Sequence, residues 1–326
     1  MTGPTQATMD LVARRRRADG LFACAGAVLV VLCLGVLVLL VGDLVRDASA
    51  RLHWSFLTNY PSRKPEQAGI LSPFVGTLLV MLVTGCTAIP LGIAAGTYLE
   101  EYARKNWLTN IIEINIANLA GVPSIIWGLM ALGLFIYGFE KWFGDPGDEV
   151  FGLGRSILTA GLTLGLLVLP IVIVATRESI RAIPQGIREA SFACGASRLE
   201  TVRHHVLPYS LPGVLTGCII AMSRAIGETA PLVTIGALSY VAFLPPVPGS
   251  VVKDIDGNVM GHAGLFDWLH SGFTVLPIQM FNWVSRPDTR FQANAAAAGL
   301  VLLTVTLLMN GVAIVLRNRM RRNIQW

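Results

Sequence analysis

Charged residues are scarce in this sequence. Only 14% of its 326 residues are Asp, Glu, Lys or Arg, whereas 53% are apolar, and the mean hydropathy is +0.61. Because soluble domains carry about 25% charged residues, this composition excludes an ordinary soluble protein. The chain is expected to be an integral membrane protein, and its 33 Gly and 17 Pro suit transmembrane helices that pack closely.

Cysteine, histidine and lysine are also few, which removes several kinds of chemistry. The five cysteines have no spacing typical of a disulfide framework or a zinc site. His204 and His205 are adjacent, so on a helix they project about 100° apart and make a poor metal pair. No lysine follows a glycine, so the chain has no Gly-Lys-Ser/Thr phosphate-binding loop. We therefore expect no metal, no cofactor and no ATP hydrolysis by this chain alone.

Six apolar segments are long enough to cross a bilayer, which needs about 20 residues. They are predicted over residues 21–41, 70–99, 111–139, 156–176, 213–244 and 293–316. The third contains Asn115, Asn118 and Pro123, and polar residues there should face other helices or an aqueous path. A cleaved signal peptide is the alternative for the first segment, although its apolar run exceeds the usual length of about 7 to 15 residues. The predicted fold class is an all-α integral membrane protein with six transmembrane helices.

Basic residues cluster beside these segments, so the sequence pI of about 9.1 indicates membrane orientation rather than nucleic-acid binding. The N-terminus, the second connection, the central connection and the C-terminus together hold 15 of the 25 Lys and Arg residues. The positive-inside rule then places both termini in the cytoplasm. The prediction is a cytoplasmic tail over residues 1–20, a transmembrane domain over 21–316 and a second tail over 317–326.

The longest connection on the outer side covers residues 245–290. Its part from 265 to 284 is rich in aromatic residues, which predicts an interfacial helix limited by Pro277. Residues 254–258 read Asp-Ile-Asp-Gly-Asn and predict a hairpin turn. A calcium loop is the weaker alternative, because Gly comes too early and the closing Glu is absent.

The central connection, residues 177–212, repeats apolar residues at helical spacing between Arg, Glu and Gln, which predicts short amphipathic helices. A membrane-surface helix without a partner would have the same composition. However, Glu189-Ala190-Ser191 followed by Gly195 and by Leu207-Pro208 resembles the EAA loop that membrane subunits of ABC importers present to their ATPase. The resemblance implies that Glu189 stabilises the start of a coupling segment that includes Ala190, Leu207 and Pro208. It also implies that Gly195 forms a bend between two short helices and that the following stretch docks into a groove on the ATPase. Ser191 and His205 depart from the usual pattern.

Residues 223–231, Ser-Arg-Ala-Ile-Gly-Glu-Thr-Ala-Pro, resemble the signature of phosphate-importer permeases of the PstA type. Further matches to that family are Gly-Val-Pro-Ser at 121–124, the Leu-Pro run at 169–178 and Phe-Asn-Trp-Val-Ser-Arg-Pro at 281–287. The EAA loop alone indicates only an ABC importer permease. The two stretches at 223–231 and 281–287 are what point to phosphate.

Arg224 and Glu228 are the charges predicted inside the fifth span. Leaving Arg224 unpaired there would cost at least ~2.5 kcal/mol, and Glu228, four positions later, is expected on the same helix face. The pair either fixes helix packing or serves the substrate path, where a guanidinium suits phosphate oxygens and the hydroxyl of Thr229 adds a donor. Arg177 either faces the anion as a second charge or anchors the span at the cytoplasm.

The resemblance implies a type I ABC importer permease fold with cytoplasmic coupling helices, in the inner membrane of a prokaryote. It also implies a second related permease, a cytoplasmic ATPase dimer, an extracytoplasmic phosphate-binding protein, membrane lipid and inorganic phosphate as partners. Two alternatives stay open. A secondary transporter would use the arginine–glutamate pair as a proton relay, but the spans contain no paired repeat. A permease for sulfate or molybdate is disfavoured by the residues at 223–231.

Overall fold

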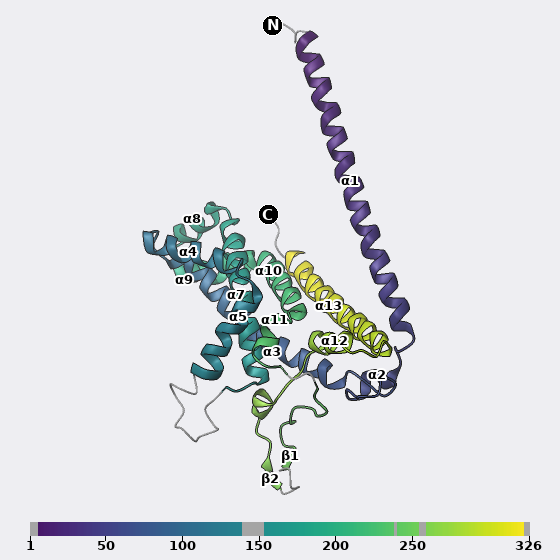
Figure 1. The fold of residues 1–326 in the computed structure, drawn as a ribbon. Coiled ribbons are helices and arrows are strands. Elements are labelled where there is room, and N and C mark those ends of the chain that lie inside the picture. The colour runs from purple at the N-terminus through teal and green to yellow at the C-terminus, as the bar shows by residue number, and fades with distance from the viewer. Residues whose placement is uncertain (1–5, 139–152, 238–239, 254–258, 323–326) are drawn as a thin grey trace.

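The computed structural model of the chain describes residues 6–138, 153–237, 240–253 and 259–322 (Figure 1). Its long helices are α1 (Gln6–Ser49), α3 (Leu71–Thr97), α7 (Ile157–Arg181), α10 (Leu207–Gly227) and α13 (Arg290–Arg322). The shorter helices are α2 (Trp54–Thr58), α4 (Trp107–Leu119), α5 (Ser124–Ala131), α8 (Gln185–Ala193), α9 (Arg198–Thr201), α11 (Ala230–Thr234) and α12 (Leu276–Val284). Three π-helical segments continue longer helices, namely η1 (Tyr98–Tyr102), η2 (Leu132–Gly138) and η3 (Val202–Val206).

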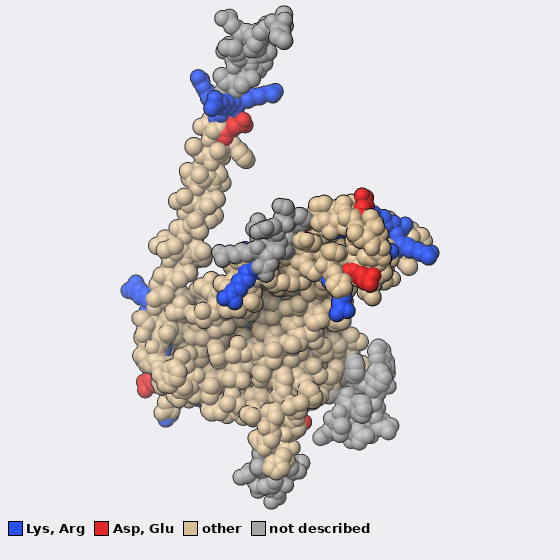
Figure 2. All heavy atoms as spheres, turned by 180° about the vertical axis from the view of Figure 1, so that it is seen from behind, with Lys and Arg blue, Asp and Glu red and all other residues tan. Residues whose placement is uncertain are grey.

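Five helical stretches in the described part of the chain are long and apolar enough to cross a membrane. A sixth is formed if α4 and α5 with η2 count as one broken span. The middle of the molecule is almost free of charged atoms on the face shown in Figure 2, and Lys, Arg, Asp and Glu gather at the ends. The prediction of an all-α membrane protein is confirmed, with one small two-stranded hairpin added.

Helix α7 forms the centre of the bundle. Two thirds of its most apolar window (67%) is buried, compared with 0% for α1. Glycines allow its close packing with α3, because a side chain at Gly92 or Gly96 would collide with α7. On the other side, α10 runs antiparallel to α7, so that Gly217 lies against Ala175 and Gly213 lies against Ser179.

Helix α1 leaves the bundle along most of its length (Figure 1). Its 44 residues would measure about 66 Å at 1.5 Å per residue, roughly twice the thickness of the bilayer core. Only its C-terminal part contacts the rest of the chain, where Leu44 approaches Gly299 of α13 and Ala48 is buried. The helix begins within the segment predicted as the N-terminal tail, so the helical part is longer than expected.

The third predicted span, residues 111–139, is broken rather than straight. The axes of α4 and of the α5–η2 stretch differ by 108° at the break between Leu119 and Ser124. Proline disfavours the α conformation in the residue before it, and Pro123 itself has ψ of 135°, so the helix restarts only at Ser124. Residue 139 lies outside the described part.

The fifth predicted span, residues 213–244, is shifted towards the N-terminus. The helical stretch runs from Arg198 to Gly227 and ends there. Proline 231 explains the end, because its ring would clash with the carbonyl of Gly227 if the helix continued. Glu228 is extended, with φ −79° and ψ 122°, and the short α11 follows before Gly236 turns the chain with φ +85°.

The connection over residues 245–290 does not contain one continuous helix over residues 265–284. It contains β1 (Val251–Lys253), which pairs antiparallel with β2 (Val259–His262), then the 3₁₀ turn η4 (Asp267–His270) and α12. The predicted hairpin turn at 254–258 lies outside the described residues, between the two paired strands. Trp283 of α12 is buried because α12 packs against α13 and α3, and Phe273 is buried in a separate cluster with Val80 and Ile157, whereas Phe266 and Phe281 are exposed.

Candidate functional site

Arg224 and Glu228 lie at the break between α10 and α11. Arg224 occupies the last turn of α10, and its Nε lies 3.3 Å from Oε1 of Glu228. The side chains are 40% and 20% exposed. The predicted pair is therefore present, but Glu228 caps the helix instead of sharing its face. The pair therefore spans the point at which α10 ends.

Thr229 follows in the same break and begins α11. Its side chain is half-buried and makes no capping hydrogen bond to the helix that it precedes. Next to Arg224, the hydroxyl of Ser223 donates to Oδ1 of Asn310 on α13 at 2.6 Å. The last turn of α10 is thus bonded to α13 through Ser223, whereas Arg224 and Thr229 lie at the break itself.

A second helix break, between α4 and α5, lies beside the first and was not predicted from the sequence. Helix α5, which starts after the turn at 121–123, packs against α11. Gly128 of α5 has no room for a side chain, because Pro231 and Thr234 of α11 occupy that space. Each break combines a glycine with a following proline, and that pairing was the available signal. Membrane transporters commonly bind substrate where discontinuous helices meet.

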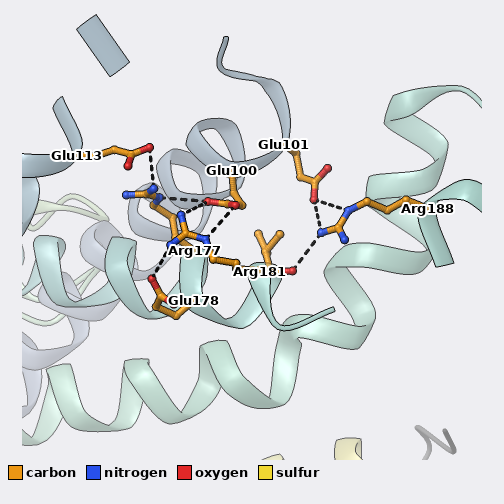
Figure 3. Close-up of polar contacts among 8 residues, drawn as sticks. Glu100, Glu101, Glu113, Arg177, Glu178, Arg181 and Arg188 are labelled. Carbon is orange, nitrogen blue, oxygen red and sulfur yellow. Dashed lines mark hydrogen bonds and ion pairs between the residues drawn. The ribbon is translucent and has the colours of Figure 1, made fainter. Parts of the chain in front are cut away.

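Arg177 lies elsewhere, in an ion-pair network at the end of the bundle that carries α8 and α9 (Figure 3). Its side chain is 9% exposed, and its guanidinium lies 2.7 Å from Glu113 of α4 and 3.5 Å from Glu100 of η1. Arg181 contacts Glu100 at 3.0 Å and Glu178 at 3.2 Å. The network joins α7, α4 and η1, and two carboxylates neutralise Arg177.

The structure does not bring Arg177 and Arg224 together. Because Ala175 faces Gly217 and Ser179 faces Gly213 across two antiparallel helices, Arg177 lies level with residue 215 of α10. Nine residues separate that level from Arg224, which is about 14 Å along the helix axis. The two arginines therefore belong to different sites of the molecule.

The residues of the predicted coupling loop occupy the same end as Arg177. Both ends of the predicted loop 177–212 are helical, because α7 continues to Arg181 and α10 begins at Leu207. We call the part between them, residues 182–206, the α8–α9 segment. Glu189 and Ala190 are exposed on α8, Gly195 turns the chain with φ +83°, and a capping box at Ser197 starts α9. Leu207 is half-buried and Pro208 exposed where α10 begins.

Arg188 is a residue that sequence reasoning counted only as a charge. It precedes Glu189 on α8, and its Nη2 lies 2.7 Å from Oε1 of Glu101. Its nitrogens also donate to the carbonyl oxygens of Ile180, in the last turn of α7, and of Ile183, just after that helix. Its position directly before the Glu-Ala pair was the only available signal. Among the described residues, no group of three His, Cys, Asp or Glu could hold a metal ion.

The family model for the inner membrane component of binding-protein-dependent transport systems matches residues 88–322. The chain belongs to this family. Its members are transport components rather than enzymes, and the match makes this chain a multi-pass subunit of the inner membrane. The matched region contains both helix breaks, the ion-pair network and the α8–α9 segment, so these features belong to the part of the chain that matches the family.

Curated relatives carry more specific names. The phosphate transport system permease protein PstA 1 of Mycobacterium tuberculosis is 28% identical over 255 residues, which cover 78% of this chain and 72% of the relative. The phosphate transport system permease protein PstA of Yersinia pestis is 29% identical over 249 residues, covering 76% and 72%. A probable ABC transporter permease, YqgI of Bacillus subtilis, is 29% identical over 222 residues, covering 68% and 70%.

Solved structures of ABC importers share the fold of this permease. A bacterial ABC transporter that imports the polysaccharide alginate matches with a TM-score of 0.61 and 13% identity, over 95% of this chain and 99% of that chain. The methionine ABC transporter MetNI in an inward-facing conformation matches with a TM-score of 0.52 and 16% identity, over 75% and 93%. The predicted ABC importer permease fold is confirmed.

Proposed function

We propose that this chain is one membrane subunit of an ATP-driven phosphate importer, and that Arg224, Glu228 and Thr229 line its translocation path. The observation that carries the proposal is the similarity to relatives named as phosphate transport permeases over more than three quarters of the chain. Residues 223–231, which resemble the signature of that family, comprise the end of α10, the break at residues 228 and 229 and the start of α11.

The position of Arg224 supports a role in the path. Its side chain is 40% exposed in a span, and a charged group at that depth is stable only if it faces water or protein rather than lipid. A planar guanidinium can form two parallel hydrogen bonds to phosphate oxygens. Glu228 would orient Arg224 or accept a proton-bearing phosphate oxygen, and Thr229 would donate a neutral hydrogen bond. Of the two roles open to Arg177, its ion pairs with Glu113 and Glu100 favour the anchor.

The α8–α9 segment supports docking of an ATPase dimer on the cytoplasmic side. Phe192 and Leu199 are 47% and 66% exposed on its two helices, next to the exposed Glu189 and Ala190. Helices α8 and α9 are too short to cross a membrane, and apolar side chains exposed on such helices indicate a contact with another protein. The chain itself has no phosphate-binding loop, so energy must come from that partner. Both termini are then cytoplasmic, and an extracytoplasmic phosphate-binding protein delivers the ion to the opposite side.

A second related permease completes the path in this proposal. Arg224 is exposed on a single chain, which leaves its open side to be covered by another membrane subunit. The exposed apolar surface of α1 is available to lipid or to that subunit.

Reconstitution tests the proposal directly. The chain, the second permease and the ATPase are placed in liposomes with the binding protein, and uptake of radiolabelled phosphate is measured with and without ATP. We expect uptake only with ATP, unaffected by collapse of ion gradients, and competition by unlabelled phosphate but not by sulfate or molybdate. Stronger competition by sulfate or molybdate would assign a different oxyanion. Uptake driven by an ion gradient without ATP would contradict the proposal as a whole.

A further inference from the structure

We infer that the ion pair between Glu101 and Arg188 links the α8–α9 segment to the transmembrane helices and passes movement between them. The inference rests on the proposed function, in which an ATPase moves α8. Glu101 and Arg188 are positioning residues in this account, since neither contacts the transported ion. Figure 3 shows the two side chains facing each other from different elements.

The link is short, shielded and multiply bonded. Arg188 donates from Nε and Nη2 to the same oxygen of Glu101, at 3.0 and 2.7 Å. The side chains of Arg188 and Glu101 are only 17% and 9% exposed. Charge-assisted hydrogen bonds in such a shielded place are stronger than surface ion pairs. Movement of one element would therefore have to carry the other with it or break this shielded contact.

The same guanidinium also forms hydrogen bonds at the end of a second transmembrane helix, α7. Its Nη1 donates to the carbonyl oxygen of Ile183 at 2.9 Å, and its Nη2 donates to that of Ile180 at 3.1 Å. The carbonyl of Ile180 lies in the last turn of α7, where helices lack intrahelical donors, and that of Ile183 lies in the connection between α7 and α8. Among the described residues, Arg188 makes the only side-chain hydrogen bonds from α8 to η1 and α7. Polar contact between α8 and these two helices thus passes through one side chain.

A force on Glu101 is passed to α3, because Glu101 lies in a helical continuation of α3. Segment η1 continues α3 without a loop, because Tyr98 keeps helical dihedral angles at the junction. Helix α3 then packs closely along α7 through glycines, so the two move together more easily than they separate. Rigid helices joined by discrete polar contacts are suitable carriers of coupling between distant sites. The link therefore connects the surface around Glu189 to the core of the bundle.

The neighbouring residues provide a matched control. Arg181 of α7 contacts Glu100 of η1, one position before Glu101, and its side chain is 51% exposed; its hydrogen bonds and ion pairs to described residues go to Glu100 and Glu178, not to α8. Arg181→Gln removes an ion pair between η1 and α7 while leaving every bond of Arg188 in place. A loss of coupling caused merely by altered charge near η1 would appear in this control as well.

The experiment compares phosphate uptake with ATP hydrolysis in proteoliposomes that hold the complete complex. For Glu101→Gln and for Arg188→Gln we expect hydrolysis to continue while uptake per ATP falls by about tenfold, a size typical of residues that carry coupling. The double variant should fall no further than either single variant, because both remove the same link. Arg181→Gln should keep the uptake per ATP of the unaltered complex.

Several results would overturn the inference. One is an unchanged uptake per ATP in Glu101→Gln, and another is a loss in the double variant that equals the product of the two single losses. If Glu101→Gln fails to assemble, Glu101→Asp keeps the charge but withdraws the carboxylate by one methylene, and uptake per ATP should still fall. An assembled Glu101→Asp with an unchanged ratio would show a purely structural role. Absence of phosphate uptake in the unaltered complex would instead contradict the proposed function.

Discussion

Glu100 and Glu101 are neighbours in η1, yet their carboxylates contact arginines of different elements. Glu100 meets Arg181 of α7, whereas Glu101 meets Arg188 of α8. The first pair is half-exposed on its arginine side and the second is shielded on both sides. One turn of π-helix thus divides its two charges between holding the bundle together and holding the α8–α9 segment to it.

The buried position of Arg177 leads to a prediction about stability. Arg177→Gln should lower the free energy of unfolding by about 3 kcal/mol, because Glu113 and Glu100 would lose their shielded cation. This is the low end of the range for buried pairs, since Glu113 is 32% exposed. Arg181→Gln, which breaks a more exposed pair, should cost at most about 1 kcal/mol. Thermal unfolding of the purified proteins compares the two. Normal stability of Arg177→Gln together with lost uptake would return Arg177 to the substrate path.

Gly195 is predicted to be sensitive even to alanine. Its φ of +83° lies in the left-handed region, so a Cβ there should cost about 1–2 kcal/mol although the surrounding space is open. Gly195→Ala should weaken co-purification of the ATPase while the spans stay inserted. Gly186→Ala is the matched control, because Gly186 is also open to solvent but lies in α8 with ordinary dihedral angles. Equal ATPase recovery with both variants would show that the bend is not required.

The contact between Gly217 and Ala175 predicts a reciprocal rescue. Gly217→Ala should destabilise the bundle by about 1–3 kcal/mol, because two methyl groups would occupy one space between α10 and α7. Adding Ala175→Gly should restore most of that stability by emptying the opposite side. Gly311→Ala, which meets open space on α13, serves as the control and should have little effect. Thermal unfolding measures all four proteins, and a double variant no more stable than Gly217→Ala would refute the predicted packing.

Arg224 and Glu228 are tested by single and double neutral variants. If Arg224 binds the ion, Arg224→Gln should assemble and take up no phosphate, and adding Glu228→Gln should not restore uptake. If the pair only holds α10 to the break, each single variant should lower the amount of assembled protein, and the double variant should recover both assembly and uptake. Membrane level and phosphate uptake are measured together for the three variants.

Ser223→Ala is the control for those variants. It removes a hydrogen bond to Asn310 next to the arginine, worth about 1 kcal/mol, without changing any charge. Uptake should persist in this variant. Loss of uptake there would mean that the last turn of α10 is intolerant of change in general, and the effect of Arg224→Gln would no longer identify a binding residue.

Hydropathy was sufficient to predict that the chain has several membrane spans and roughly where they lie, because the apolar length of a segment is a local property. It did not predict whether Pro123 bends a helix or ends it, because that depends on packing of α5 against α11. The same holds for Pro231, whose helix was expected to continue to residue 244. In both cases the sequence marks the position of the break, and tertiary contacts decide its angle.

The partners of the charged residues were harder to predict than their presence. Arg188 and Glu101 are 87 positions apart, and no periodicity relates them. The pairing of Arg224 with Glu228 was predicted because four positions on a helix are neighbours, although the helix ends between them. Trp283 was expected at the membrane surface and is fully buried, since hydropathy does not distinguish lipid from a helix neighbour.

The contact between α1 and α13 has a consequence for how the chain is made. Arg51, just after α1, donates to Oδ1 of Asn294 on α13 at 2.6 Å, across 243 positions of sequence. During synthesis from the N-terminus, α1 therefore enters the bilayer long before its partner helix exists. A single helix is stable in the bilayer when its surface is apolar and its backbone hydrogen bonds are formed within the helix, as in α1. A chain that ends before α13 would therefore lack Asn294, which bonds both Arg51 and the carbonyl oxygen of Pro65, and the loop after α1 would lose that contact.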